Sequence, residues 1–109
     1  MKGYAVLLTA GAKGDLEQIY DYVFETAGPA AADRLLGRII EAAEKLATNP
    51  DRGFRPRELL ELGVHDYRQL VVRPYRLFYR VTDRRVYVTV IAHLRRDMQT
   101  LLTRRLLGG

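Results

Sequence analysis

The sequence contains no cysteine, no tryptophan and only two histidines. Without cysteine, the fold cannot depend on a disulfide or on a thiolate-bound metal ion. The two histidines, His65 and His93, do not have the close spacing of a histidine metal site. We therefore expect no metal ion and no other cofactor.

The chain also lacks a long hydrophobic run. No uninterrupted apolar stretch approaches the ~20 residues that cross a bilayer, and residues 1–4 lead directly into a strand-like segment without a leader pattern. We therefore expect no membrane association and a cytoplasmic location.

What is present is typical of one globular domain. The chain has 109 residues, of which 48% are hydrophobic and 28% are charged. A chain of this length buries roughly two-thirds of its unfolded surface, which is enough for one core. We assign residues 1–109 to a single domain.

The positive charge is concentrated in the second half of the chain. Residues 1–50 hold five basic and seven acidic residues, a net charge of −2, whereas residues 51–109 hold thirteen arginines and six acidic residues, a net charge of +7. Such a skew is typical of a surface for nucleic acid or for an acidic partner, but a solvated basic face would show it equally.

The first half predicts one strand and two helices. Residues 4–9 are short and β-rich, and residues 10–14 break the pattern, with Thr9 able to cap the next element. A helical spacing of apolar residues begins at Asp15 and ends at Gly28-Pro29, and a second apolar stripe continues to about Thr48. The short joint predicts an antiparallel helical hairpin.

The second half predicts three strands and a short helix. Residues 49–56 form an irregular connection, and residues 57–63 could form a helical turn. Strand-like runs cover 66–73, 75–82 and 86–93, with alternation that predicts one buried face, and residues 97–107 predict a helix capped by Asp97. The fold class is α+β, with the helical hairpin packed on an antiparallel sheet of about four strands.

No generic catalytic motif is present, since the chain has no glycine-rich phosphate loop, nucleophile elbow or paired-histidine spacing. The sheet and tail instead interleave arginines with tyrosines. Such strands suit phosphates and unstacked bases, and they suit the carboxylates of a partner chain equally well. Direct binding to nucleic acid therefore stays open.

Several stretches, in this order, resemble the RelE/ParE superfamily of toxins from type II toxin–antitoxin systems. They are Asp15-Leu16-x-x-Ile19-Tyr20-x-Tyr22, Leu46-x-x-Asn49-Pro50-x-x-Gly53, Tyr75-Arg76-Leu77-x-Tyr79-x-Val81 and Val90-Ile91-x-His93-x-x-Arg96-Asp97. The ending from Ile91 to Leu106 is most similar to the ParE branch. The resemblance implies a toxin that is held inactive by an antitoxin encoded beside it.

The two branches imply different targets. ParE-like members are understood to poison DNA gyrase without being nucleases, whereas RelE-like members cut messenger RNA in the ribosome. The positions that match the RelE-like nucleases are Arg68, Arg76, His93 and Arg96, with Arg95 as an alternative to Arg96. A second RelE lysine position falls on Leu70, the late tyrosine falls near Leu102, and Leu94 after His93 removes the His-Tyr pair of another nuclease branch.

These departures disfavour catalysis. Cleavage through a ribose 2′-hydroxyl needs a base and an acid, and arginine is effectively never deprotonated, so His93 would carry all proton transfer. We therefore favour a toxin that poisons gyrase without enzymatic activity. The alternatives are a RelE-like ribosome-dependent endoribonuclease and a decayed toxin that only sequesters its antitoxin.

The expected partner is an acidic, ParD-like antitoxin in a hetero-oligomer. The helices have only one sheet face to cover, so part of their apolar surface is free for a partner segment, and the basic second half favours an acidic one. The predicted partner-binding residues are Leu16, Ile19, Tyr20, Val23, Arg73, Arg76, Arg80 and Arg95.

Overall fold

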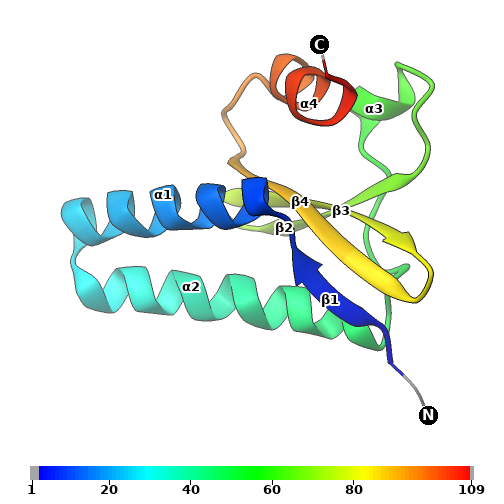
Figure 1. Ribbon diagram of the computed structural model, residues 1–109. Helices are drawn as coiled ribbons and strands as arrows, with labels where there is room; N and C mark the ends of the chain where they lie inside the picture. Colours follow the sequence, from blue (N-terminus) through cyan, green and yellow to red (C-terminus); the bar gives the residue numbers. More distant parts are fainter. Residues whose placement is uncertain (1–2, 109) are drawn as a thin grey trace.

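The computed structural model describes residues 3–108 as one four-stranded sheet with helices on both faces (Figure 1). The elements run β1 (Ala5–Leu8), α1 (Ala10–Ala27), α2 (Pro29–Glu44), the 3-10 turn η1 (Lys45–Ala47), α3 (Arg57–Leu60), β2 (Tyr67–Val72), β3 (Tyr75–Thr82), β4 (Arg85–His93) and α4 (Met98–Leu107). The α+β class, the helical hairpin and the C-terminal helix are confirmed.

The sheet is mixed rather than wholly antiparallel. Its strand order is β1-β4-β3-β2, with β2, β3 and β4 antiparallel and β1 parallel to β4. Short connections force consecutive strands to pair antiparallel, but β1 meets β4 only after the helical hairpin and two further strands. No short connection therefore fixes the direction of β1, which is why the prediction of a wholly antiparallel sheet is wrong for this strand.

Helix α1 begins at Ala10, five residues earlier than the sequence pattern predicts. Thr9 caps it, because its Oγ1 accepts a hydrogen bond of 3.2 Å from the Ala12 N–H. Residues 10–14 form the first turns of the helix rather than a break, and Ala12 is fully buried there. The predicted joint is confirmed: Gly28, at φ 93°, ends α1, and Pro29 opens α2.

Both faces of the sheet are buried, whereas the alternation predicted one. One cluster lies between the α1/α2 hairpin and the sheet and includes Leu35, Ile39, Leu77 and Tyr79. A second cluster lies on the opposite face. It consists of Leu59, Tyr67, Phe78, Val90, Ala92, Met98, Leu101 and Leu102. Figure 1 shows α3 and α4 together, away from the hairpin.

A bulge in β4 changes which residues of the strand face each cluster. Phe78 pairs with Val90 but Tyr79 pairs with Val88, so Thr89 is the extra residue. Val88 therefore packs in the first cluster and Val90 in the second. The alternation in residues 86–93 predicts that Val86, Val88, Val90 and Ala92 share one face; this is wrong for Val88 and Val90, because a period of two does not continue through a bulge.

An ion pair connects the bulge to both helical layers. Nη1 and Nη2 of Arg105, on α4, lie 2.9 Å and 3.1 Å from the carboxylate oxygens of Asp15 on α1. Nη2 of Arg105 also donates to the Thr89 carbonyl at 3.1 Å, and the carboxylate of Asp15 accepts from the Ile91 N–H at 2.9 Å. Because β1 pairs with β4 only as far as Val88, these side chains satisfy the strand edge that β1 leaves uncovered.

The connection after α2 is fixed by a buried tyrosine. The hydroxyl of Tyr79 donates to the Pro50 carbonyl at 2.7 Å and accepts from the Gly53 N–H at 3.0 Å. Burial raises the pKa of Tyr79. A Cβ at position 53 would lie 2.5 Å from the Gln69 carbonyl oxygen and 2.7 Å from the Tyr79 hydroxyl, so only glycine fits there.

Two glycines of α1 give a matched test of the Asp15/Arg105 pair. A Cβ at Gly11 would lie 2.5 Å from Nη2 of Arg105, whereas a Cβ at Gly14 meets nothing within 4 Å. We expect Gly11→Ala to be less stable than Gly14→Ala by about 1 kcal/mol, because the guanidinium group of Arg105 must shift away from Asp15 and Thr89, which offsets the gain in helix propensity. Gly14→Ala should raise the free energy of unfolding by about 0.5–1 kcal/mol through helix propensity. Denaturant titration of both variants is the measurement, and an equal gain for both would contradict the role of the pair.

Candidate functional site

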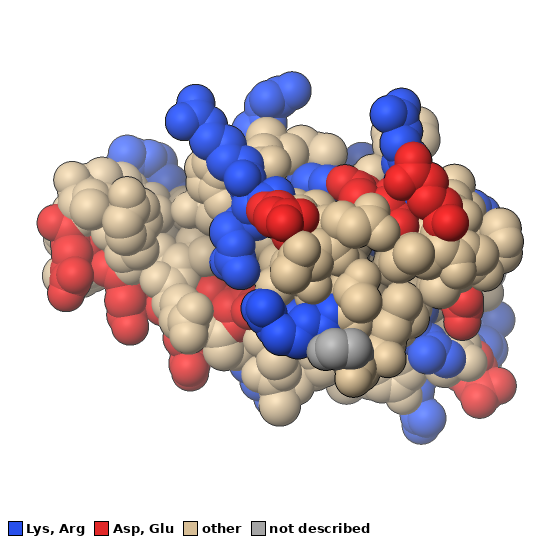
Figure 2. Space-filling view, turned by 90° about the horizontal axis from the view of Figure 1, so that it is seen from above, with Lys and Arg blue, Asp and Glu red and all other residues tan. Residues whose placement is uncertain are grey.

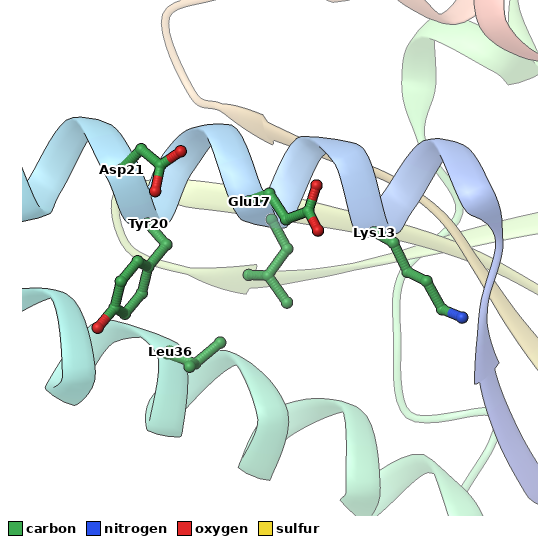
Figure 3. Close-up of a pocket in the computed structure, with 6 residues that line it drawn as sticks. Lys13, Glu17, Tyr20, Asp21 and Leu36 are labelled. Carbon is green, nitrogen blue, oxygen red and sulfur yellow. The ribbon is translucent and has the colours of Figure 1, made fainter.

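A groove runs between α1 and α2 on the outside of the hairpin, with a volume of about 540 Å³. Its lining residues are Lys13, Leu16, Glu17, Tyr20, Asp21 and Leu36. Figure 3 shows Tyr20 reaching from α1 toward α2, and its hydroxyl donates to Asp33 at 2.6 Å. This hydrogen bond is the main reason that the pKa of Tyr20 is raised. The groove therefore offers an apolar floor with charged margins.

A second groove of about 630 Å³ lies on the other side of α1, where α1 and α2 meet the ends of β3 and β4. Its apolar part includes Ile19, Tyr22 and Val23, and the side chain of Tyr22 is 64% exposed. Arg38 and Arg96 add positive charge. A large exposed aromatic side chain beside arginines is typical of a protein-binding surface.

His93 closes one end of the second groove. Its ring lies edge-on against Tyr75, with the ring centroids 5.4 Å apart, and its Nδ1 accepts a hydrogen bond of 3.0 Å from the Arg95 N–H. Arg96 follows on the turn toward α4, and its backbone N–H donates to the His93 carbonyl. His93 and Arg96 are thus brought together at this groove.

The predicted apolar contact residues all lie along these two grooves. Leu16 and Tyr20 line the first, and Ile19 and Val23 line the second. Leu16, Ile19 and Val23 also pack against the core with their inner sides. One helix, α1, therefore forms a wall of both grooves.

The predicted contact arginines do not form one patch. Arg73 and Arg95 are exposed at the end of the sheet that borders the second groove. Arg80 lies at the other end of β3, with its guanidinium carbon 5.8 Å from the centroid of the Tyr67 ring. Arg76 is largely enclosed, with 12% of its side chain exposed. Figure 2 shows basic side chains over the middle of this face with acidic ones among them, and further acidic side chains at the tip where α1 and α2 join.

Arg76 is occupied by neighbours that the sequence reasoning missed. Its Nη1 and Nη2 each lie 2.9 Å from a carboxylate oxygen of Glu58 on α3, and its Nε lies 2.6 Å from Oε1 of Gln69. The hydrogen bonds from Arg76 are the largest cause of the lowered pKa of Glu58. Glu58 lies 18 positions before Arg76 in a four-residue helix, so no sequence period could connect the two.

The positions that match the RelE-like nucleases are separated. Arg76 pairs with Ala92, which packs on the α4 face, whereas Arg68 pairs with Tyr79 and His93 pairs with Tyr75 on the hairpin face. Tyr75 and Tyr79 are four residues apart along β3, or about 13 Å at the rise of a strand.

Arg68 is also occupied, because its Nη1 donates to the Gly53 carbonyl at 2.9 Å and its Nη2 lies 3.8 Å from Asp51. These four residues therefore cannot act on one phosphate in this arrangement.

Within residues 3–108, no helix is long and apolar enough to cross a membrane, and no three acidic or histidine side chains gather to hold a metal ion.

Comparison with known proteins gives the family. The family model described as "ParE toxin of type II toxin-antitoxin system, parDE" matches residues 6–98. The chain belongs to this ParE toxin family. It is a toxin of the type II toxin–antitoxin class within the RelE/ParE superfamily, as the ordered motifs predicted.

Curated relatives carry both branch names. Toxin RelE2 of Caulobacter vibrioides is 37% identical over 92 residues, which cover 84% of this chain and 96% of that protein. Toxin ParE1 of Mycobacterium tuberculosis is 32% identical over 93 residues, covering 84% and 91%. The ParE family fold is therefore shared by proteins named for either branch.

Two solved structures from toxin–antitoxin systems have a fold similar to that of this chain. The chromosomal ParDE system from P. aeruginosa matches with a TM-score of 0.70 and 26% identity over 83% of this chain and 95% of that one. The toxin–antitoxin complex RelBE2 from Mycobacterium tuberculosis matches with a TM-score of 0.62 and 26% identity over 85% and 93%.

The contact between Glu58 and Arg76 predicts a defined pH dependence. Because the pKa of Glu58 is lowered in the folded chain, its stabilising contribution is present above the ordinary carboxyl pKa of about 4.3 and is lost as the pH falls through the folded value. We expect Glu58→Gln to lower the free energy of unfolding by about 1 kcal/mol at pH 7 and by less below about pH 4. Denaturant titrations across this range measure the gap. The exposed Glu61 supplies the control, and an equal pH-dependent gap for Glu61→Gln would refute the assignment.

Proposed function

We propose that this ParE-family toxin acts in the cytoplasm by binding and poisoning DNA gyrase, without being a nuclease. The observation that carries the proposal is the separation of Arg68, Arg76 and His93 over two sheet faces, with Arg76 enclosed by Glu58. Phosphodiester cleavage needs a base, an acid and charge stabilisation around one phosphate. A toxin that acts by occupying a protein target needs none of these.

We also propose that a small acidic, ParD-like antitoxin neutralises the chain by covering the two grooves beside α1. The ParDE and RelBE2 structures that match this fold are, by their titles, a toxin–antitoxin system and a toxin–antitoxin complex. In the second groove Asp15 is already paired with Arg105, and within residues 3–108 neither Arg38 nor Arg96 pairs with a carboxylate. An amphipathic acidic segment would complement this combination of apolar floor and unneutralised guanidinium groups.

Ribosome-dependent messenger cleavage is the alternative, and one observation favours it: His93 and Arg96 lie together at the second groove. A histidine can act as acid or base and an arginine can stabilise charge. The two activities predict different targets for the same purified protein.

The target can be tested directly. The purified toxin should inhibit supercoiling by gyrase and should leave ribosome-bound messenger intact, because the nuclease-like positions are not assembled. His93→Ala, expressed without antitoxin, should still arrest growth. Cleaved messenger together with unaffected gyrase would reject the gyrase proposal, and absence of any growth defect would favour a decayed toxin.

The antitoxin surface can be tested with two exposed aromatic residues. Tyr22 lines the second groove, whereas Phe54 is 77% exposed and lies outside both grooves. Tyr22→Glu should weaken binding to the acidic protein encoded by the neighbouring reading frame by about tenfold or more, because it places a carboxylate in an apolar contact facing an acidic partner. Phe54→Glu makes a comparable change and should leave the affinity unchanged. Calorimetric titration of both variants measures this, and equal losses would place the antitoxin elsewhere.

A further inference from the structure

The face of the sheet that carries α4 holds one nearly buried guanidinium group in a fully formed anion-binding geometry. Arg76 extends from β3 with its guanidinium carbon 4.8 Å from the centroid of the Phe78 ring, and its Nε is held by Gln69. Stacking and the Nε contact fix the plane of the group. The two terminal nitrogens therefore point in one fixed direction.

Both terminal nitrogens point at the carboxylate of Glu58, at 2.9 Å each. This two-pronged arrangement is the one in which arginine binds either a carboxylate or a phosphate. The side chain of Glu58 is 25% exposed, against 12% for Arg76, so Glu58 is the partner on the solvent side of the pair. Arg57, the preceding residue on α3, adds a second positive charge that helps to lower the pKa of Glu58.

We propose that Glu58 is an internal occupant of a phosphate-binding position, and that this carboxylate is what prevents the α4 face of the toxin from binding an RNA phosphodiester. Without Glu58, Arg76 has no counter-charge in a position that excludes most water, and such a group binds strongly to any anion that reaches it. With Glu58 in place, an incoming phosphate must displace a carboxylate held by two charge-assisted hydrogen bonds. Glu58 therefore acts as a determinant of which class of partner this face accepts.

The role of Glu58 at Arg76 does not depend on gyrase being the target of the toxin. Gyrase, the ribosome and the antitoxin are all absent from the binding reaction that tests it. A toxin that fails to inhibit gyrase could still contain this occupied position, and a gyrase poison could lack it.

The experiment measures the affinity of the full chain for a short, fluorescein-labelled single-stranded RNA by fluorescence anisotropy. Glu58→Gln keeps the size of the side chain and removes its charge, whereas Glu58→Ala also opens the space. The matched controls are Glu61→Gln and Glu61→Ala, which change the net charge equally at an exposed residue just after α3. Thermal unfolding of each variant establishes that it is folded at the temperature of the titration.

We expect both Glu58 variants to bind the RNA about tenfold more tightly than the corresponding Glu61 variants, as one additional charge-assisted contact would give. Their binding should also depend more steeply on salt, because one more phosphate is neutralised. Adding Arg76→Gln to Glu58→Gln should return the affinity to that of the unaltered chain, and inorganic phosphate should compete for the gained affinity.

Three results would overturn the proposal. The first is equal affinity of the Glu58 and Glu61 variants, which would mean that only net charge matters. The second is a gain that survives Arg76→Gln, and the third is an unaltered chain that already binds the RNA as tightly as the Glu58 variants. Glu58→Ala keeps the test decisive if the amide of Glu58→Gln still occupies the position.

Discussion

The ion pair between Asp15 and Arg105 is the contact on which the three layers of the molecule depend. It joins the first turns of α1 to α4 and satisfies the backbone of β4 at the bulge, where β1 no longer pairs with that strand. The Asp15 carboxylate is a poor partner for any third group, because its oxygens already accept from Arg105 and from Ile91. The Asp15/Arg105 pair thus makes the hydrogen bonds to the backbone of β4 that a longer β1 would otherwise make.

The bulge at Thr89 changes which side chains of β4 face the hairpin and which face α4. Before it, Val86 and Val88 pack in the core under the hairpin; after it, Val90 and Ala92 pack in the core under α4, while Ile91 still faces the hairpin. The hairpin side leaves both flanks of α1 open as grooves, whereas the α4 side is closed by α3 and by the Glu58 contact with Arg76. The two grooves proposed for partner binding and the enclosed Arg76 therefore lie on opposite faces of the sheet.

Periodicity predicted the elements whose burial repeats regularly. The stripe of α2, the strands β2 to β4 and the Asp97 cap of α4 all follow from local spacing and from turn chemistry. The apolar residues of α1 that line the grooves were predicted for the same reason, since exposed and buried sides of one helix alternate along the chain. Their contact with a partner stays a prediction.

Most of the features that sequence reasoning missed depend on contacts between distant positions. Gly11 and Gly14 suggested a break, but the Thr9 cap and the contact of α1 with Arg105 hold a helix there. The parallel pairing of β1, the bulge and the Glu58 contact join positions that no local period connects. An arginine-rich strand looked like an open basic surface because the sequence does not show which carboxylate folds over it.

The Tyr79 hydroxyl gives a reason why two separate motifs belong together. It bonds to the Pro50 carbonyl and to the Gly53 N–H, 29 and 26 positions away along the chain. Asn49-Pro50-x-x-Gly53 and the Tyr75-Arg76-Leu77-x-Tyr79 strand are therefore two halves of one contact. Any side chain at position 53 would collide with that hydroxyl and with the strand edge at Gln69. A substitution at position 53 thus disturbs Tyr79 as well, so the irregular connection and the strand that anchors it form one structural unit.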